Sequence, residues 1–257
     1  MTRFPPGTFT PAPGPGQLSR MLLTQARTEF ILTLRNGEQV LLTLLIPLAL
    51  LISLTELKVV PVPSPRVNHL TPQILALAVM STAFTGQAIA LGFDRRYGVL
   101  KRLAATALPR WSLVAGRMLA VLGVVLVQLV VLGAVALVLG WRPEPAGLAP
   151  AALLILTGTA AFGALGVLLG GTLRAEVVLA VANTVWLMLV VAGGLVLSVQ
   201  ALPGPLATIA AVLPSGALAE GLRAALVYGA LPGRELGVLA AWAVAAGMLA
   251  ARTLRLS

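Results

Sequence analysis

The chain contains long apolar stretches, separated by short polar segments, that can each cross a lipid bilayer as a helix. A hydrocarbon core about 30 Å thick needs roughly 20 apolar helical residues. Helices satisfy their own backbone hydrogen bonds in lipid, so we predict an all-α membrane protein with six transmembrane helices. The predicted spans are Val40–Leu57, Pro72–Leu91, a third from Arg117 or Met118 to Gly140, Leu148–Gly171, Val177–Val199 and Leu236–Ala251.

The composition argues against a soluble domain. Hydrophobic residues make up 58% of the 257 residues and charged residues 10%, whereas soluble domains carry about 25% charged residues. The mean hydropathy is +0.98. Residues 1–17 are rich in proline and glycine, and we predict that they form a disordered cytoplasmic tail. Residues 18–257 are predicted to form a single membrane domain.

The basic residues indicate the orientation of the chain. Six spans place both termini on one side, and the positive-inside rule makes that side the cytoplasm. The basic residues predicted to be cytoplasmic are Arg3, Arg20, Arg27, Arg35, Arg95, Arg96, Lys101, Arg102, Arg110, Arg117, Arg174, Arg252 and Arg255. Those predicted to be outside are Lys58, Arg66, Arg142, Arg223 and Arg234. Because the basic residues lie in short loops rather than on one face, we expect no nucleic-acid partner despite the net charge of +10.

Arginine is far more frequent than lysine, and alanine, glycine and proline are abundant. This usage is typical of GC-rich bacterial genomes. We therefore predict a multi-pass protein of the bacterial inner membrane, with both termini in the cytoplasm.

Residues Leu18 to Arg35 have the pattern of an amphipathic helix. Leu22, Ala26 and Phe30 recur every four residues on one face, while basic and polar residues occupy the other. We expect this N-terminal interfacial helix to lie flat on the membrane. Asn36 and the glycine after it are expected to turn the chain into the bilayer.

The segment Gln200–Gly233, between the last two predicted spans, contains two apolar stretches that are too short to cross the bilayer. We predict a pair of short external or re-entrant helices at Leu206–Val212 and Ala217–Val227. The alternative is one kinked seventh span. That alternative would put Glu220 and Arg223 at membrane depth, where charges are costly, and would place the C-terminus outside.

The polar stretch Gly92–Arg110 lies between the second and third predicted spans and contains the only aspartate of the chain, Asp94. Read as one amphipathic helix, it has an apolar stripe and places Asp94 at the N-cap. The stripe consists of Phe93, Tyr97, Leu100, Ala104 and Ala107, and the basic residues are Arg95, Arg96, Lys101, Arg102 and Arg110. One interpretation is a cytoplasmic anchor whose arginines contact lipid phosphates.

The same stretch resembles the loop between the second and third spans in permeases of the type-2 ATP-binding-cassette exporter family. The matching positions are Asp94, Arg95, Tyr97, Gly98, Leu100, Leu103, Pro109 and Arg110. Arg96 departs from the second acidic residue that is common in the family. The segment before the last span is also similar, at Leu213, Pro214, Glu220, Leu222 and Arg223. The resemblance covers the chain after Gly16.

The resemblance implies that this stretch is a cytoplasmic coupling helix that docks on a separate ATPase subunit. The residues implied in coupling are Phe93, Asp94, Arg95, Arg96, Tyr97, Gly98, Leu100, Arg102 and Leu103. It further implies a permease that pairs with a second permease, identical or related, among membrane lipids. The implied cargo is lipophilic or amphipathic: a drug, an antibiotic, a lipid or a lipid-linked glycan. We expect this chain to bind no cofactor, because ATP and Mg²⁺ would be bound by the ATPase subunit.

The sequence carries little chemistry of its own. Neither Lys58 nor Lys101 has the glycine spacing of a Walker phosphate loop. The central parts of the predicted spans hold no ionisable residue, whereas a proton-driven transporter would need some. Both observations favour a transporter that is driven by energy from a partner protein. An intramembrane enzyme is disfavoured because the chain has a single aspartate, no cysteine, and one histidine, His69, in a proline-rich loop.

Several polar residues lie within the predicted spans. Hydrogen bonding between helices is the ordinary role of such residues. In the resembling family, the second and fifth spans of two protomers face each other across the export path. Candidates for the lining are Thr82, Thr85, Asn183 and Trp186. The alternative function is a non-transporting signalling or immunity membrane protein that uses the basic loop for docking.

Overall fold

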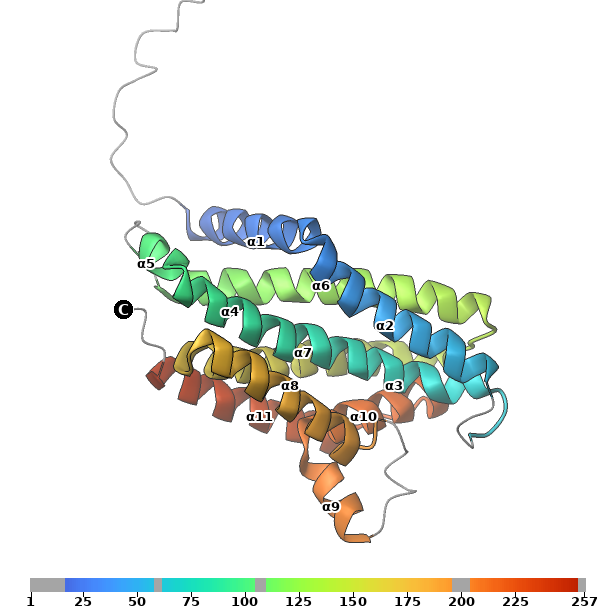
Figure 1. The fold of residues 1–257 in the computed structure, drawn as a ribbon. Coiled ribbons are helices and arrows are strands. Elements are labelled where there is room, and N and C mark those ends of the chain that lie inside the picture. Colours follow the sequence, from blue (N-terminus) through green and yellow to red (C-terminus); the bar gives the residue numbers. More distant parts are fainter. Residues whose placement is uncertain (1–16, 58–61, 105–109, 196–203, 254–257) are drawn as a thin grey trace, which may run out of the picture.

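The computed structural model describes residues 17–57, 62–104, 110–195 and 204–253. Within these ranges all regular structure is helical, and most of the long helices run side by side in one bundle (Figure 1). The elements are α1 Leu18–Arg35, α2 Gly37–Glu56, α3 Arg66–Met80, the π-helical turn η1 Ser81–Gly86, α4 Gln87–Arg96, α5 Val99–Ala104, α6 Arg110–Val138, the 3₁₀ turn η2 Pro145–Gly147, α7 Leu148–Thr172, α8 Ala175–Ala192, α9 Gly204–Val212, α10 Pro214–Tyr228 and α11 Gly233–Thr253. The predicted N-terminal tail lies outside the described residues, apart from Gln17.

The all-α membrane class is confirmed. In the part of the chain that the structure describes, five helical segments are long and apolar enough to cross a membrane: Arg66–Arg96, Trp111–Val138, Pro145–Thr172, Ala175–Ala192 and Gly233–Thr253. The first predicted span corresponds to α2. The stretch Thr43–Glu56 within α2 is apolar, and a sixth crossing by this helix stays a prediction.

Helix ends differ most from the predicted spans in the second, third and fifth. The fifth was predicted to continue to Val199, but α8 ends at Ala192, and residues 196–199 lie outside the described part of the chain. The second was predicted to begin at Pro72, but its helix begins at Arg66 and continues through α3, η1 and α4 to Arg96. The third was predicted from Met118, but α6 begins at Arg110. Hydropathy marks only the stretch that matches the hydrocarbon core. Polar residues extend these helices beyond it.

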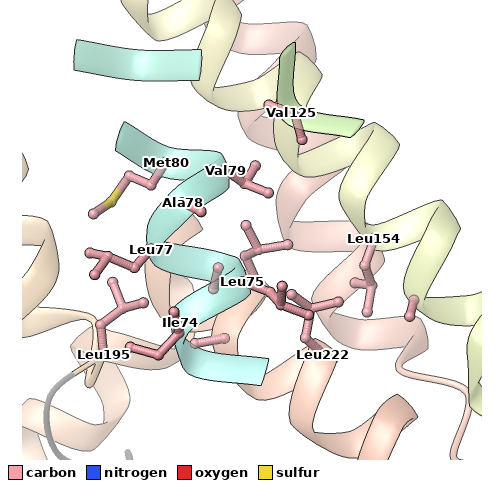
Figure 2. Close-up of a cluster of buried hydrophobic side chains, with 14 of the residues drawn as sticks. Ile74, Leu75, Leu77, Ala78, Val79, Met80, Val125, Leu154, Leu195 and Leu222 are labelled. Atoms are coloured by element: carbon pink, nitrogen blue, oxygen red, sulfur yellow. The ribbon is translucent and has the colours of Figure 1, made fainter. Parts of the chain in front are cut away.

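The helix formed by α3, η1 and α4 is the centre of the bundle, and most of its residues from Val67 to Gly92 are buried. Figure 2 shows residues Ile74 to Met80 of α3 among side chains from the neighbouring helices. The labelled neighbours are Val125 of α6, Leu154 of α7, Leu195 just after α8, and Leu222 of α10. Movement of this helix therefore changes contacts with several others.

Helix α10 packs into the bundle rather than lying outside it. Leu218 of α10 approaches Gly158 of α7, and further along α10 Gly221 approaches Leu154 of α7. The two helices therefore run in opposite directions. Gly158 lies ten residues after Leu148, the start of α7, so α10 reaches roughly 15 Å along α7. This depth supports the re-entrant form of the predicted pair.

The two charged residues of α10, Glu220 and Arg223, are paired with each other. Arg223 Nε donates to Glu220 Oε2 at 3.0 Å, and a second guanidinium nitrogen donates to the Tyr228 hydroxyl at 3.0 Å. A buried guanidinium is tolerated when its charge and donors are satisfied in this way.

Replacing Gly147 with alanine is expected to destabilise the protein. A Cβ atom on Gly147 would overlap the carbonyl oxygen of Ala225 in α10. Backbone must then shift, at a cost of about 1–3 kcal/mol. The measurement is thermal unfolding of the purified protein. Gly237→Ala is the matched control, because nothing lies within 4 Å of a Cβ there. Equal melting temperatures for the two variants would contradict the close packing of η2 on α10.

Helix α1 has the predicted bounds, and Ala26 on its apolar face is buried. Gln25 Cγ approaches Gly116 of α6, and Phe30 approaches Gly123, so contacts advance in the same direction along both helices. Helix α1 therefore runs along the first part of α6 (Figure 1). The position of α1 at the membrane surface stays a prediction.

Candidate functional site

The predicted coupling stretch is two helical segments joined by a tight turn. Helix α4 ends at Arg96, Tyr97 and Gly98 form the turn, and α5 begins at Val99. Gly98 has φ +70°, a left-handed conformation that glycine adopts without steric cost. The prediction of one helix with Asp94 at its N-cap is wrong, because the helix of the second span continues through Asp94 without a break. Residues 105–109 lie outside the described part of the stretch.

Asp94 belongs to an ionic cluster that joins three helices. Its carboxylate pairs with Arg117 of α6, and an Arg117 nitrogen lies 4.0 Å from Glu29 Oε2 of α1. The Arg117 side chain is only 11% exposed. A cation so poorly solvated needs paired negative charge. We refer to Glu29, Asp94 and Arg117 as the triad, and it ties α4 to both α1 and α6.

Arg95 ties the same helix to α7. A guanidinium nitrogen of Arg95 donates to the carbonyl oxygens of Gly170 at 3.1 Å and Leu173 at 3.2 Å. The last carbonyls of a helix have no partner within the helix, and the helix dipole is negative there. Arg95 thus serves as a cationic cap for the C-terminal end of α7.

Leu100 anchors α5 by apolar contact. It is buried in a small cluster with Leu91, Val167 and Ala250, which come from α4, α7 and α11. Together with Asp94 and Arg95, it fixes the turn to the membrane-spanning body. These three predicted coupling residues therefore contact other helices of the same chain.

The other predicted coupling residues form an outward surface. Tyr97 is 63% exposed, and its ring stacks on Phe93 with centroids 6.1 Å apart. Arg96 lies over the Tyr97 ring at 6.0 Å and pairs with Glu176 of α8. Arg102 is exposed on α5, Leu103 is half-buried and Gly98 provides the turn. The structure therefore separates the predicted set into an anchoring group and an accessible group.

A cleft of about 350 Å³ lies between this stretch and the turn that joins α7 to α8. Its lining combines cationic and apolar residues, and we refer to it as the basic cleft. The lining residues are Gly92, Arg95, Arg96, Leu100, Lys101, Thr172, Leu173, Arg174, Ala175 and Glu176.

Sequence reasoning missed Glu29, Arg117, Arg174 and Glu176 as site residues. The sequence signal was present only as charge, since the two arginines counted solely toward the positive-inside bias. Their partners lie on other helices, which a linear pattern does not reveal.

The four predicted path residues do not share one surface. Thr82 donates to Gln128 Oε1 of α6 at 2.8 Å, and Trp186 Nε1 donates to Ser81 Oγ at 3.0 Å. The Thr85 hydroxyl oxygen is buried without a hydrogen-bond partner. Only Asn183 is exposed, on α8. Thr82 and Trp186 therefore join helices within the protomer.

The sequence model of ABC-2 type transporters matches residues 19–227 of the chain. The match runs from α1 to nearly the end of α10, so it includes the triad, the Tyr97–Gly98 turn and the basic cleft. No curated protein matches the chain.

Proposed function

Because the chain belongs to the ABC-2 type transporter family, it is a membrane permease component of an ATP-binding-cassette transporter, and we propose that it works as an exporter. Membership confirms the resemblance found in the coupling stretch, and it implies an ATPase partner. The observation that carries the proposal is the anchored turn. One side of the coupling stretch presents exposed aromatic and cationic residues, and its other side is bonded to α1, α6 and α7. Movement of a partner bound to the exposed side would therefore be passed on to the spans.

In the proposed mechanism, ATP binding and hydrolysis in the partner supply the energy. Closure of two ATPase subunits displaces the Tyr97–Gly98 turn in each protomer. The triad passes this displacement to α1 and α6, and Arg95 passes it to α7. Such rigid-body transmission between packed helices is a common form of conformational switching. The spans then open the path toward the outside.

The proposed path lies between two copies of this chain or between it and a related permease. Helix α8 supports this arrangement, because it presents an exposed apolar face that also carries Asn183. The exposed large apolar residues of that face are Val177, Leu179, Leu187, Met188 and Val191. An apolar surface with one amide suits a lipophilic or amphipathic cargo. A drug, an antibiotic, a lipid or a lipid-linked glycan has this character.

Asn183→Trp is expected to slow export at least tenfold, because a large ring would fill the proposed path. ATPase binding should be unchanged, since Asn183 lies on α8, outside the coupling stretch. The measurement is efflux of a lipophilic dye from proteoliposomes. Val130→Trp is the control, at a 71% exposed position on α6. Thr85→Trp is a poor test, because the Thr85 oxygen is buried and overpacking alone would impair folding.

The alternative, a signalling or immunity protein that does not move cargo, shares the docking surface. The two functions differ in the response of the partner ATPase. For an exporter, lipophilic compounds should change the ATP turnover of the purified complex at least severalfold. An unchanged turnover with every compound, together with no efflux, would favour the alternative.

A further inference from the structure

The basic cleft has the size of a small-ligand site. Its volume of about 350 Å³ lies within the range of roughly 300–1,000 Å³ that is typical of such sites. Tyr97 and Arg102 do not line it. The cleft shares Arg96 with the outward surface that we assign to the ATPase, but the two residues that we expect to dominate ATPase binding lie outside it.

The cleft holds uncompensated positive charge. Arg96 and Glu176 neutralise each other. Arg95 donates to backbone carbonyls, which leaves its charge uncancelled. Among the described residues, neither Lys101 nor Arg174 forms a salt bridge, and both are exposed. Three positive charges thus remain for an anionic ligand.

The N-terminal end of α8 adds to this field. Arg174 occupies the N-cap position, and Ala175 begins an 18-residue helix. The first amides of a helix and its dipole favour negative charge. The side chain of Glu176 also lies in this first turn, but it pairs with Arg96 across the cleft. Arg174 and Ala175, at the start of α8, line the same cleft as Lys101.

The position of the cleft matches the headgroup layer of a bilayer. The candidate spans on either side end at Thr172 and begin at Ala175, so the turn between them lies where the hydrocarbon core ends. Gly92, Leu100 and Leu173 contribute apolar wall. Basic pockets between transmembrane helices on the cytoplasmic side suit anionic lipid headgroups.

We propose that the basic cleft binds the phosphate headgroup of an anionic phospholipid from the cytoplasmic leaflet. This proposal rests on the proposed function in one respect, which is that the cleft lies on the cytoplasmic side of the membrane. The phosphate would lie between Lys101 and Arg174, with Arg95 beneath. A bound lipid would join α5 to the α7–α8 turn and so hold the coupling stretch against the body of the protein.

The test measures binding of phosphatidylglycerol to the purified chain in the absence of ATPase, and native mass spectrometry detects the bound lipid. Lys101→Gln with Arg174→Gln is expected to weaken binding by about thirtyfold, since each basic residue near an anionic lipid contributes about fivefold. The control is Arg20→Gln with Arg27→Gln. It removes equal charge from exposed positions on α1 outside the cleft and should leave binding within about twofold of wild type.

Equal affinity in the wild type and the cleft variant would overturn the proposal, as would equal losses in the cleft and control variants. Inorganic phosphate is the second probe. Competition by phosphate as strong as by phosphatidylglycerol would identify a soluble anion and contradict a lipid. If the cleft variant keeps lipid but no longer binds ATPase, the cleft is a protein-docking site and the proposal fails. Because transport is not measured, failure of export would leave this result unaffected.

Discussion

Replacing both Tyr97 and Arg102 with alanine is expected to weaken binding of the ATPase subunit by roughly a thousandfold. Tyrosine and arginine are the side chains that most often dominate interfaces, with losses of about 2 kcal/mol or more on truncation. Two such losses add to about 4 kcal/mol, which corresponds to roughly a thousandfold change in the dissociation constant. Both side chains are exposed and belong to the outward surface of the coupling stretch. The fold should be preserved.

The measurement is equilibrium binding of purified ATPase to the chain in nanodiscs. The matched control is Tyr228→Ala with Arg234→Ala. It removes the same residue types from exposed positions expected on the outer side. The control should bind ATPase like the wild type, compared at equal concentrations of folded protein because Tyr228 also contacts Arg223. An equal loss in both variants would refute the assignment of this surface.

Arg117→Ala is expected to cost about 3–5 kcal/mol of stability, because it leaves Asp94 and Glu29 together without their cation. It should also uncouple the complex, so that cargo no longer changes ATP turnover. Release of α4 from α1 and α6 is the physical reason. Thermal unfolding and cargo-stimulated ATP hydrolysis are the two measurements.

Two further variants separate this effect from simple loss of charge. Arg117→Lys keeps the charge but loses the planar fork, so it should fall between wild type and Arg117→Ala. Asp94→Ala combined with Arg117→Ala should cost less than the sum of the single changes. If Arg117→Ala unfolded at the same temperature as Arg20→Ala, an exposed change on α1, the triad would have no structural role.

Local patterns predicted the elements whose ends are set locally. The bounds of α1 follow from its apolar spacing and from Asn36, which occupies the C-cap. The start of α7 at Leu148 agrees with the predicted fourth span. The break at Leu213 and Pro214 likewise separates α9 from α10. In each case neighbouring residues carry the signal.

Tertiary contacts explain what the sequence did not predict. Asp94 reads as a helix cap, but its partner Arg117 lies 23 residues away on another helix. The direction of α1 depends on close approach at Gly116 and Gly123 of α6. Thr82 and Thr85 lie in the π-helical turn Ser81–Gly86, which changes the rotation of side chains along the helix. A regular helical period therefore does not assign the faces of these two residues.

The central claim is that a nucleotide-hydrolysing partner contacts the turn between the second and third predicted spans. The most direct measurement is photo-cross-linking in cells from p-benzoylphenylalanine placed at Tyr97, with placement at Tyr228 as the control. These are the only two tyrosines, and their exposures of 63% and 60% are nearly equal. We predict a cross-link to an ATP-binding-cassette ATPase from position 97 and none from position 228. A cross-link to the ATPase from position 228, or none from position 97 while the complex is active, would contradict the account.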